Sequence, residues 1–368
     1  MRFPALTAPR VENKCGGALL VQAAYRRATE VFLPPVESAA KPGICMKPAS
    51  DEASENGGAT TAERKAVCVI AWPASHSRSP LIHNYWIKQH GLNAEYWREA
   101  VPPEEFPEFV KNLRTHGYVG ANVTIPHKQT ALEVSTPDER ARAVGAANTL
   151  WYEGDTLRST NTDVEGFLAN LDIATPGWDR GLESAIVLGA GGGARAVTFA
   201  LLAREVERVY VINRTVDRAE AIQKQFGAPV HVAGWDEITG LLGGAGLLVN
   251  TTTLGMVGQP PLEINLRCPA SLVVADLVYD PLETGLLKAA RERGLRVADG
   301  LGMLLHQAVR GFELWFGVRP EVTAELRALV EADLGVAPSP VVEEKAEPPV
   351  KVKKPKRLKK RGGGVPAA

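Results

Sequence analysis

Apolar positions recur along the chain with two different periods, and their alternation predicts an α/β protein. Short apolar runs bounded by Gly, Pro or polar residues are typical of buried strands, whereas apolar residues three or four positions apart are typical of helices. In the first half, strands are predicted at 66–71, 94–101 and 120–125, with helices at 79–89 and 104–116. This β-α-β-α-β succession predicts parallel strand pairing.

Residues 126–174 continue the first half with a different pattern. Helical stretches are predicted around 129–133 and 137–144. Glu153-Gly154-Asp155 separates the strand-like segments 148–152 and 156–160, as in a β-hairpin, and a helix is predicted at about 164–171. We therefore expect a first domain, residues 65–174, that holds a mixed sheet.

A second domain is predicted to begin near Pro176-Gly177 and to span residues 175–300. Its alternating pattern predicts a Rossmann-like, doubly wound parallel sheet with right-handed crossovers. The helices are expected near Ala194, Val216, Trp235 and Thr284. The strands are expected at Ser184–Leu188, Arg208–Ile212, Leu247–Asn250, 272–276 and Arg296–Ala298. The final helical stretches, within 301–334, follow the last strand and are expected to complete the first domain.

The two ends of the chain depart from this periodic pattern. Residues 1–64 show no sustained period, and residues 336–368 are Pro-rich and charged, with eight Lys or Arg side chains between 351 and 361. Both are predicted to be disordered extensions. The basic tail is interpreted as a solubilising segment, with weak binding to nucleic acid or an acidic partner as the alternative.

Composition narrows the class of protein without changing this picture. The 42 basic residues balance 42 acidic ones, so no global field attracts nucleic acid, and nothing in the composition demands a membrane. The four cysteines, Cys15, Cys45, Cys68 and Cys268, are far apart and form no metal-binding or disulfide pattern. We expect reduced thiols in a cytoplasmic protein that carries no metal site.

The segment SAIVLGAGGGARAVTFA, residues 184–200, combines a strand, a glycine turn and a helix. Its G-x-G-x-x-A spacing lets the backbone turn tightly and approach a pyrophosphate, which the N–H groups of the new helix stabilise. A glycine-rich turn alone can be a bare loop, but the flanking strand and helix favour a dinucleotide site. The predicted cofactor-binding residues of this turn are Gly189, Ala190, Gly191, Gly192 and Gly193.

The residues after the next strand indicate which dinucleotide binds. In this fold, an acidic side chain suits a free ribose 2′-hydroxyl, whereas arginine suits a 2′-phosphate. Here the sequence reads Asn213-Arg214-Thr215, with Arg218 one turn further on. Two guanidinium groups and a hydroxyl favour NADP over NAD.

Polar side chains gather at three places in the first domain, close to predicted strand ends. They lie on NVTIPHK (Asn122, Thr124, Lys128), AANT (Asn148, Thr149) and NTD (Asn161, Thr162, Asp163). Each has a plain structural explanation: a lysine is often a solvated surface charge, and Asn, Thr and Asp cap helices and close turns. Three such clusters beside a dinucleotide domain nevertheless indicate catalysis.

These motifs together make the chain resemble the shikimate dehydrogenases. The resemblance spans about residues 66–333. It is carried, in order, by SHSRSP, GANVTIPHK, GAANT, NTD, GAGGGAR, NRTVDR, NTTTLGM, DLVY and DGLGMLLHQA. It implies the NADPH-dependent reduction of 3-dehydroshikimate to shikimate, in the pathway to chorismate and the aromatic amino acids.

The resemblance also implies roles for individual residues. Lys128 is expected to donate and recover the proton of the reaction, paired with Asp163. The implied substrate contacts are Ser77, Ser79, Thr124, Asn148, Asp163, Tyr279 and Gln307. Beyond the turn and Asn213, Arg214, Thr215 and Arg218, the implied cofactor contacts are Thr251, Leu277, Gly300, Met303 and Glu139.

One departure and three open questions accompany this resemblance. Ala194 stands where family members often have Ser, so one phosphate-binding hydroxyl is missing. One alternative is a quinate/shikimate dehydrogenase that uses NAD. Another is a non-catalytic sensor or regulator on the same fold. The expected ligand is a small molecule, and a homodimer is left open.

Overall fold

The computed structural model describes residues 64–336. The predictions for the two terminal extensions, including the disordered N-terminal segment and the basic tail, lie outside the described residues. No helix within the described range is long and apolar enough to cross a membrane.

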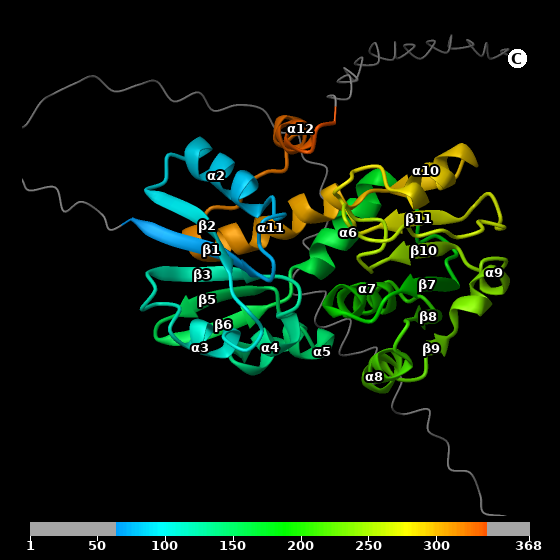
Figure 1. Ribbon diagram of the computed structural model, residues 1–368, viewed down its shortest axis with the longest axis horizontal. Helices are drawn as coiled ribbons and strands as arrows, with labels where there is room; N and C mark the ends of the chain where they lie inside the picture. Colours follow the sequence, from blue (N-terminus) through cyan, green and yellow to red (C-terminus); the bar gives the residue numbers. More distant parts are fainter. Residues whose placement is uncertain (1–63, 337–368) are drawn as a thin grey trace, which may run out of the picture. The chain divides into compact units, whose positions relative to one another are not determined.

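The first sheet has six strands in the order β2-β1-β3-β5-β6-β4 and is mixed (Figure 1). Strand β1 pairs in parallel with β2 and β3, whereas β5 runs antiparallel to both β3 and β6. The strands are β1 (Lys65–Ala71), β2 (Ala94–Ala100), β3 (Tyr118–Val123), β4 (Thr136–Pro137), β5 (Thr149–Glu153) and β6 (Thr156–Thr160).

Alternating side chains of β1 show why helices cover both faces of this sheet. Val67 and Val69 are buried in one hydrophobic cluster, and Cys68 and Ile70 are buried in another. The first cluster includes side chains of α2 (Ser79–Gln89), α11 (Gly300–Phe316) and α12 (Ala324–Asp333). The second includes side chains of α3 (Phe106–Lys111), α4 (Lys128–Glu133) and α5 (Glu139–Val144).

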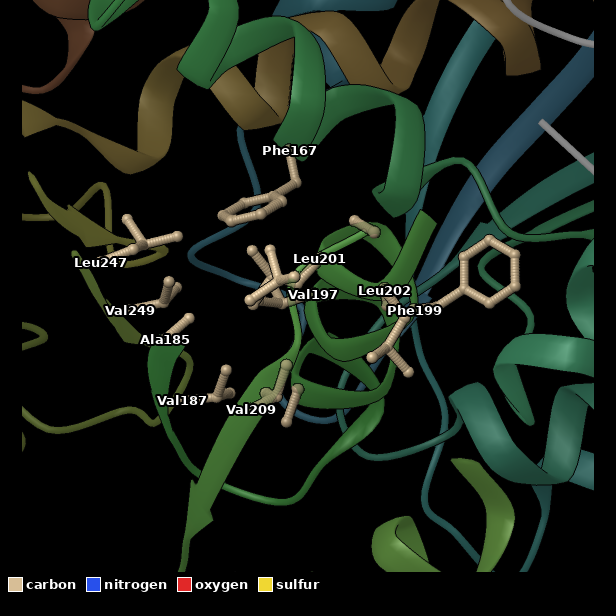
Figure 2. Packing of buried hydrophobic residues seen from close by; sticks show 14 of the residues in the cluster. Phe167, Ala185, Val187, Val197, Phe199, Leu201, Leu202, Val209, Leu247 and Val249 are labelled. Atoms are coloured by element: carbon tan, nitrogen blue, oxygen red, sulfur yellow. The ribbon is translucent and has the colours of Figure 1, made fainter. Parts of the chain in front are cut away.

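The second sheet is entirely parallel, in the order β12-β11-β10-β7-β8-β9. Helices α6 (Asp163–Ala174), α7 (Gly192–Ala203) and α8 (Val216–Phe226) cover one face, as Figure 2 shows for α7 and Phe167. The 3₁₀ turn η1 (Trp235–Glu237) leads to α9 (Ile238–Leu241), which with α10 (Gly285–Glu292) covers the other face. The strands are β7 (Ser184–Leu188), β8 (Arg208–Ile212), β9 (Val230–Ala233), β10 (Leu247–Asn250), β11 (Val273–Asp276) and β12 (Arg296–Ala298).

The predicted fold class is confirmed, and the structure corrects three of its details. Residues 137–144 do not form one helix, because Thr136 and Pro137 pair with β6 and Asp138 then caps α5 by accepting from the Ala141 N–H at 2.7 Å. The helix predicted over 104–116 is shorter and ends at Lys111. Strand β9 was not predicted, since its four residues form a half-buried edge with too few positions to show a period.

A close crossing of α6 and α11 connects the two halves. Helix α6 packs against α7 and β12, whereas α11 packs against β3 and β5. Gly166 makes this approach possible, because a Cβ there would lie 2.7 Å from the Met303 carbonyl oxygen and 2.7 Å from the Gln307 Cβ. The crossing therefore brings Gln307 of α11 toward the N-terminal end of α6.

Candidate active site

Lys128 and Asp163 form a largely buried ion pair at the N-terminal ends of two helices. Lys128 begins α4 and Asp163 begins α6. The lysine Nζ lies 2.6 Å from Asp163 Oδ2, and the two side chains are 15% and 5% exposed. Lys128 is thus no solvated surface charge, and Asp163 makes no side-chain cap of its helix. An ammonium held in this way is available as a proton donor beside a buried carboxylate.

Asn148 ties this ion pair to the neighbouring polar residues. Its Nδ2 donates to Asp163 Oδ1 at 2.9 Å, and its Oδ1 accepts from the Thr162 N–H at 2.8 Å. Gln307 Oε1 lies 3.4 Å from the same Nδ2. The structure therefore brings together four residues that the sequence singled out: Lys128, Asn148, Asp163 and Gln307.

Of the predicted substrate serines, Ser77 lies on the loop between β1 and α2, and Ser79 begins α2. Ser79 is buried and its N–H donates to Ser77 Oγ at 3.3 Å, while Arg98 Nη2 donates to the Ser77 carbonyl at 2.7 Å. The Tyr279 hydroxyl lies 3.4 Å from the His76 carbonyl of the same loop. Burial raises the pKa of Tyr279, so its phenol stays protonated and able to donate.

Thr124 lies just beyond β3 and shortly before Lys128. Its N–H donates to the Ile70 carbonyl at 3.0 Å, and its carbonyl accepts from the His127 N–H at 2.9 Å. These backbone bonds occupy its main chain and leave its half-buried hydroxyl near the start of α4.

The glycine turn lies against the catalytic candidate Lys128. Gly191 caps α7, and a Cβ at Gly192 would lie 3.0 Å from the Lys128 Cβ. Gly189 has φ of +109°, and a Cβ there would lie 2.6 Å from Thr251 Oγ1. The turn is therefore confined by the loop after β10 on one side and by Lys128, the first residue of α4, on the other. At Gly191 it is open.

Two sets of the remaining predicted cofactor residues lie beyond β8 and beside the glycine turn. Arg214, Thr215 and Arg218 are exposed beyond β8, where the Asn213 Nδ2 donates to the Thr215 carbonyl at 2.8 Å. Leu277 contacts the turn, since a Cβ at Gly193 would lie 3.3 Å from its Cδ2, and a Cβ at Gly300 would lie 2.4 Å from the Leu277 carbonyl oxygen.

Met303 and Glu139 are placed differently from the other cofactor candidates. Met303 is 7% exposed and belongs to the hydrophobic cluster that surrounds α7. Glu139 begins α5 with an exposed side chain that has no recorded partner within the described range. The structure does not bring Glu139 into contact with the glycine turn.

The sequence analysis missed a buried carboxylate under the cofactor loops. Asp276 ends β11, is 1% exposed, and accepts from Asn250 Nδ2 at 2.8 Å, Thr284 Oγ1 at 2.7 Å and the Val278 N–H at 3.0 Å. Burial raises the pKa of Asp276 to about 6, although these hydrogen bonds lower it. Its place in DLVY, directly before Leu277, was the available signal.

No group of three or more His, Cys, Asp or Glu side chains that could hold a metal ion occurs among residues 64–336. The exposed arginines and the open glycine turn instead suit a phosphate-bearing dinucleotide. A parallel doubly wound sheet with such a turn, placed beside a buried Lys–Asp pair, defines a dinucleotide-dependent oxidoreductase.

Comparisons with known proteins specify the family. Residues 69–150 match the shikimate dehydrogenase substrate binding domain, residues 179–255 match shikimate / quinate 5-dehydrogenase, and residues 300–329 match the shikimate 5'-dehydrogenase C-terminal domain. Shikimate dehydrogenase (NADP(+)) of Rhodopseudomonas palustris (strain TIE-1) is 66% identical over 274 residues, which are 74% of this chain and 98% of that protein. The chain belongs to the shikimate dehydrogenase family.

Two solved structures show that the fold alone does not distinguish a shikimate dehydrogenase from a quinate dehydrogenase. Shikimate 5-dehydrogenase from Thermus thermophilus, in complex with NADP(H) and shikimate, is 34% identical with a TM-score of 0.62 and covers 74% of this chain and 98% of its own. Quinate dehydrogenase from Corynebacterium glutamicum, in complex with NAD, is 30% identical with a TM-score of 0.66 and covers 73% and 99%. Specificity therefore depends on side chains and not on the fold.

The raised pKa of Asp276 predicts a stability difference that depends on pH. Because the folded protein binds this proton more tightly than the unfolded chain, the contribution of Asp276 is greatest below its ordinary pKa and is lost as pH rises through about 6. From pH 5 to pH 8, the free energy of unfolding of the wild type should fall by about 1 kcal/mol relative to Asp276→Asn. Urea unfolding at both pH values measures this.

Asp217→Asn provides the matched control, because the Asp217 side chain is exposed. Replacing this exposed side chain should change the free energy of unfolding by less than about 0.5 kcal/mol. A difference for Asp276→Asn that does not change between pH 5 and pH 8 would contradict the assignment of a buried, titrating carboxyl.

Proposed function

We propose that this chain catalyses the reversible, NADPH-dependent reduction of 3-dehydroshikimate to shikimate. The observation that carries the proposal is the buried pair of Lys128 and Asp163, 2.6 Å apart, whose lysine side chain lies against Gly192 of the dinucleotide turn. A proton donor and a dinucleotide site meet there. The reaction serves the pathway to chorismate and the aromatic amino acids.

The chain's own residues then supply what the carbonyl reduction needs. NADPH, when bound, supplies a hydride to the ring ketone carbon. Lys128 donates a proton to the carbonyl oxygen as negative charge develops on it, so hydride and proton together give the alcohol. Asp163 orients the ammonium and stabilises its charge, and Asn148 keeps the carboxylate in place by its hydrogen bond to Oδ1. In the reverse direction, Lys128 accepts the proton.

The substrate is held by hydroxyl and amide groups around this pair. We assign the carboxylate of the substrate to the hydroxyls of Ser77, on the loop before α2, and Ser79, the first residue of α2. The ring hydroxyls and the carboxylate are assigned to the polar groups at the strand ends and on α11. These groups are Thr124, Asn148, Asp163, Tyr279 and Gln307.

One half of the chain binds the substrate and the other binds NADP. Residues 65–174 together with 301–334 form the proposed substrate domain, and residues 175–300 form the proposed NADP domain. The turn from Gly189 to Gly193 accommodates the pyrophosphate, and Arg214 and Arg218 bind the 2′-phosphate. A cytoplasmic location remains a prediction from the sequence, and a homodimer is left open.

Turnover measured with shikimate or quinate, and with NADP or NAD, tests the proposed function directly. We expect NADPH formation at 340 nm with shikimate and NADP, and a markedly lower kcat/KM for every other pair. A preference for quinate and NAD would establish the alternative dehydrogenase. Absence of turnover with all four pairs would favour the non-catalytic regulator.

Lys128→Ala should lower kcat about a hundredfold or more, because the alkoxide then forms without a positioned proton donor. Binding of NADPH, measured by its fluorescence, should persist. Lys111→Ala is the matched control, since this exposed lysine on α3 pairs with Glu108 and lies on another helix than Lys128. A loss of cofactor affinity that accounts for the whole effect would show that Lys128 has a binding role.

Arg214→Asp should reverse the cofactor preference, because a carboxylate repels the 2′-phosphate and accepts a hydrogen bond from a free 2′-hydroxyl. The ratio of kcat/KM for NADP to that for NAD should fall by at least tenfold, in line with the loss of one charge-assisted contact. Arg208→Asp, an exposed change at the start of β8, serves as the control. Unchanged selectivity in Arg214→Asp would refute the assignment.

A further inference from the structure

Tyr96 is a buried tyrosine whose hydroxyl has hydrogen-bond partners in Asn122 and Ser79. It lies on β2, is 2% exposed, and donates to Asn122 Oδ1 at 2.6 Å. Asn122 lies on β3 and is itself 5% exposed. Strand β1 lies between these two strands in the first sheet, so this hydrogen bond reaches from β2 across β1 to β3.

A continuous chain of hydrogen bonds runs from Asn122 to the catalytic pair. The Asn122 Nδ2 donates to Thr149 Oγ1 at 3.1 Å and lies 3.3 Å from the Asn148 carbonyl. Thr149 Oγ1 donates to Asn148 Oδ1 at 3.2 Å. The Asn148 Nδ2 then donates to Asp163 Oδ1, whose other oxygen accepts from Lys128.

His83 supports the Tyr96 ring from one side. It is fully buried on α2, and its ring stacks on that of Tyr96 with centroids 4.3 Å apart and planes 10° apart. Burial lowers the pKa of His83 to about 3, while the adjacent Asn122 raises it, so the imidazole is neutral at physiological pH. Neither ring nitrogen reaches hydrogen-bond geometry with a described residue. His83 therefore acts by shape and not by charge.

The hydroxyl of Tyr96 decides which way the Asn122 amide points. An amide carries an acceptor at one end and donors at the other, and a reversed amide would turn its oxygen toward the Asn148 carbonyl. Because Tyr96 donates to Oδ1, the Nδ2 end must face Thr149 and Asn148. A phenylalanine would leave a buried acceptor without its donor, which is costly and allows the amide to turn.

We propose that Tyr96 is a positioning residue for the reaction: its hydroxyl orients Asn122, which holds Thr149 and Asn148 where they align the Asp163–Lys128 pair. This inference rests on the proposed function, since the aligned pair matters through proton transfer. It adds a residue on β2, remote in sequence from Lys128, to the machinery of the site.

Tyr96→Phe tests the proposal because it removes the hydroxyl and keeps the stacked ring. We expect kcat/KM for shikimate to fall about tenfold, the worth of one oriented buried hydrogen bond, with KM for NADP within twofold of the wild type. Tyr118→Phe is the matched control, because the Tyr118 hydroxyl lies in the same sheet but donates to Glu99. It is not part of the series of hydrogen bonds that leads from Asn122 to Asp163. A general structural defect would instead lower the melting temperature and change the kinetic constants for NADP as well as those for shikimate.

A double-mutant cycle with Asn122→Ala separates the proposed route from other effects. Asn122→Ala alone should reduce kcat/KM for shikimate at least as much as Tyr96→Phe. Adding Tyr96→Phe to Asn122→Ala should cause no further loss, because the hydroxyl then has nothing to orient. Additive losses, or a Tyr96→Phe enzyme as active as the wild type, would overturn the inference. Either outcome leaves wild-type turnover, and thus the proposed function, in place.

Discussion

The site depends on holding one ammonium and one carboxylate together where little water reaches them. Removing Lys128 and Asp163 from solvent costs several kcal/mol per ion, which only good geometry and further hydrogen bonds offset. Asn148 supplies such a bond to Asp163 Oδ1. The β5–β6 hairpin is what makes this possible, because Asn148 immediately precedes β5 and Asp163 follows β6 by three residues.

Two glycines allow the rest of the chain to reach this ion pair. Gly192 lets the dinucleotide turn approach the Lys128 side chain, where any Cβ would contact the lysine at 3.0 Å. Gly166 lets α11 cross α6 closely enough for Gln307 to reach Asn148. The glycine turn and the polar residues of the first half of the chain therefore meet because two side chains are missing, as well as through hydrogen bonds between the polar residues.

Much of the fold could be predicted because strand and helix periods are strong in this chain. Every strand of the parallel sheet except β9 was predicted, since each is a short, largely apolar run and all of them but β10 are followed directly by a helix. Lys128, Asn148 and Asp163 stood out because they belong to polar clusters close to predicted strand ends. Tyr96 and Asp276 did not. Tyr96 lies within β2 and Asp276 ends β11, and the partners that give them a role, Asn122 and Asn250, are on other strands. No local pattern records that pairing.

The polar residues within the two sheets therefore fix the orientation of their neighbours and add little net stability. A buried hydrogen bond contributes only about 1 kcal/mol, but leaving its partner unsatisfied costs up to about 3 kcal/mol, so a buried amide is held strongly in one orientation. Asn122 and Asn250 both sit at strand ends beneath a functional loop, and each is fixed by a neighbour, Tyr96 or Asp276. Because these amides are fixed in direction, Lys128 beside the first sheet and the Gly189–Gly193 turn of the second sheet can meet at one site.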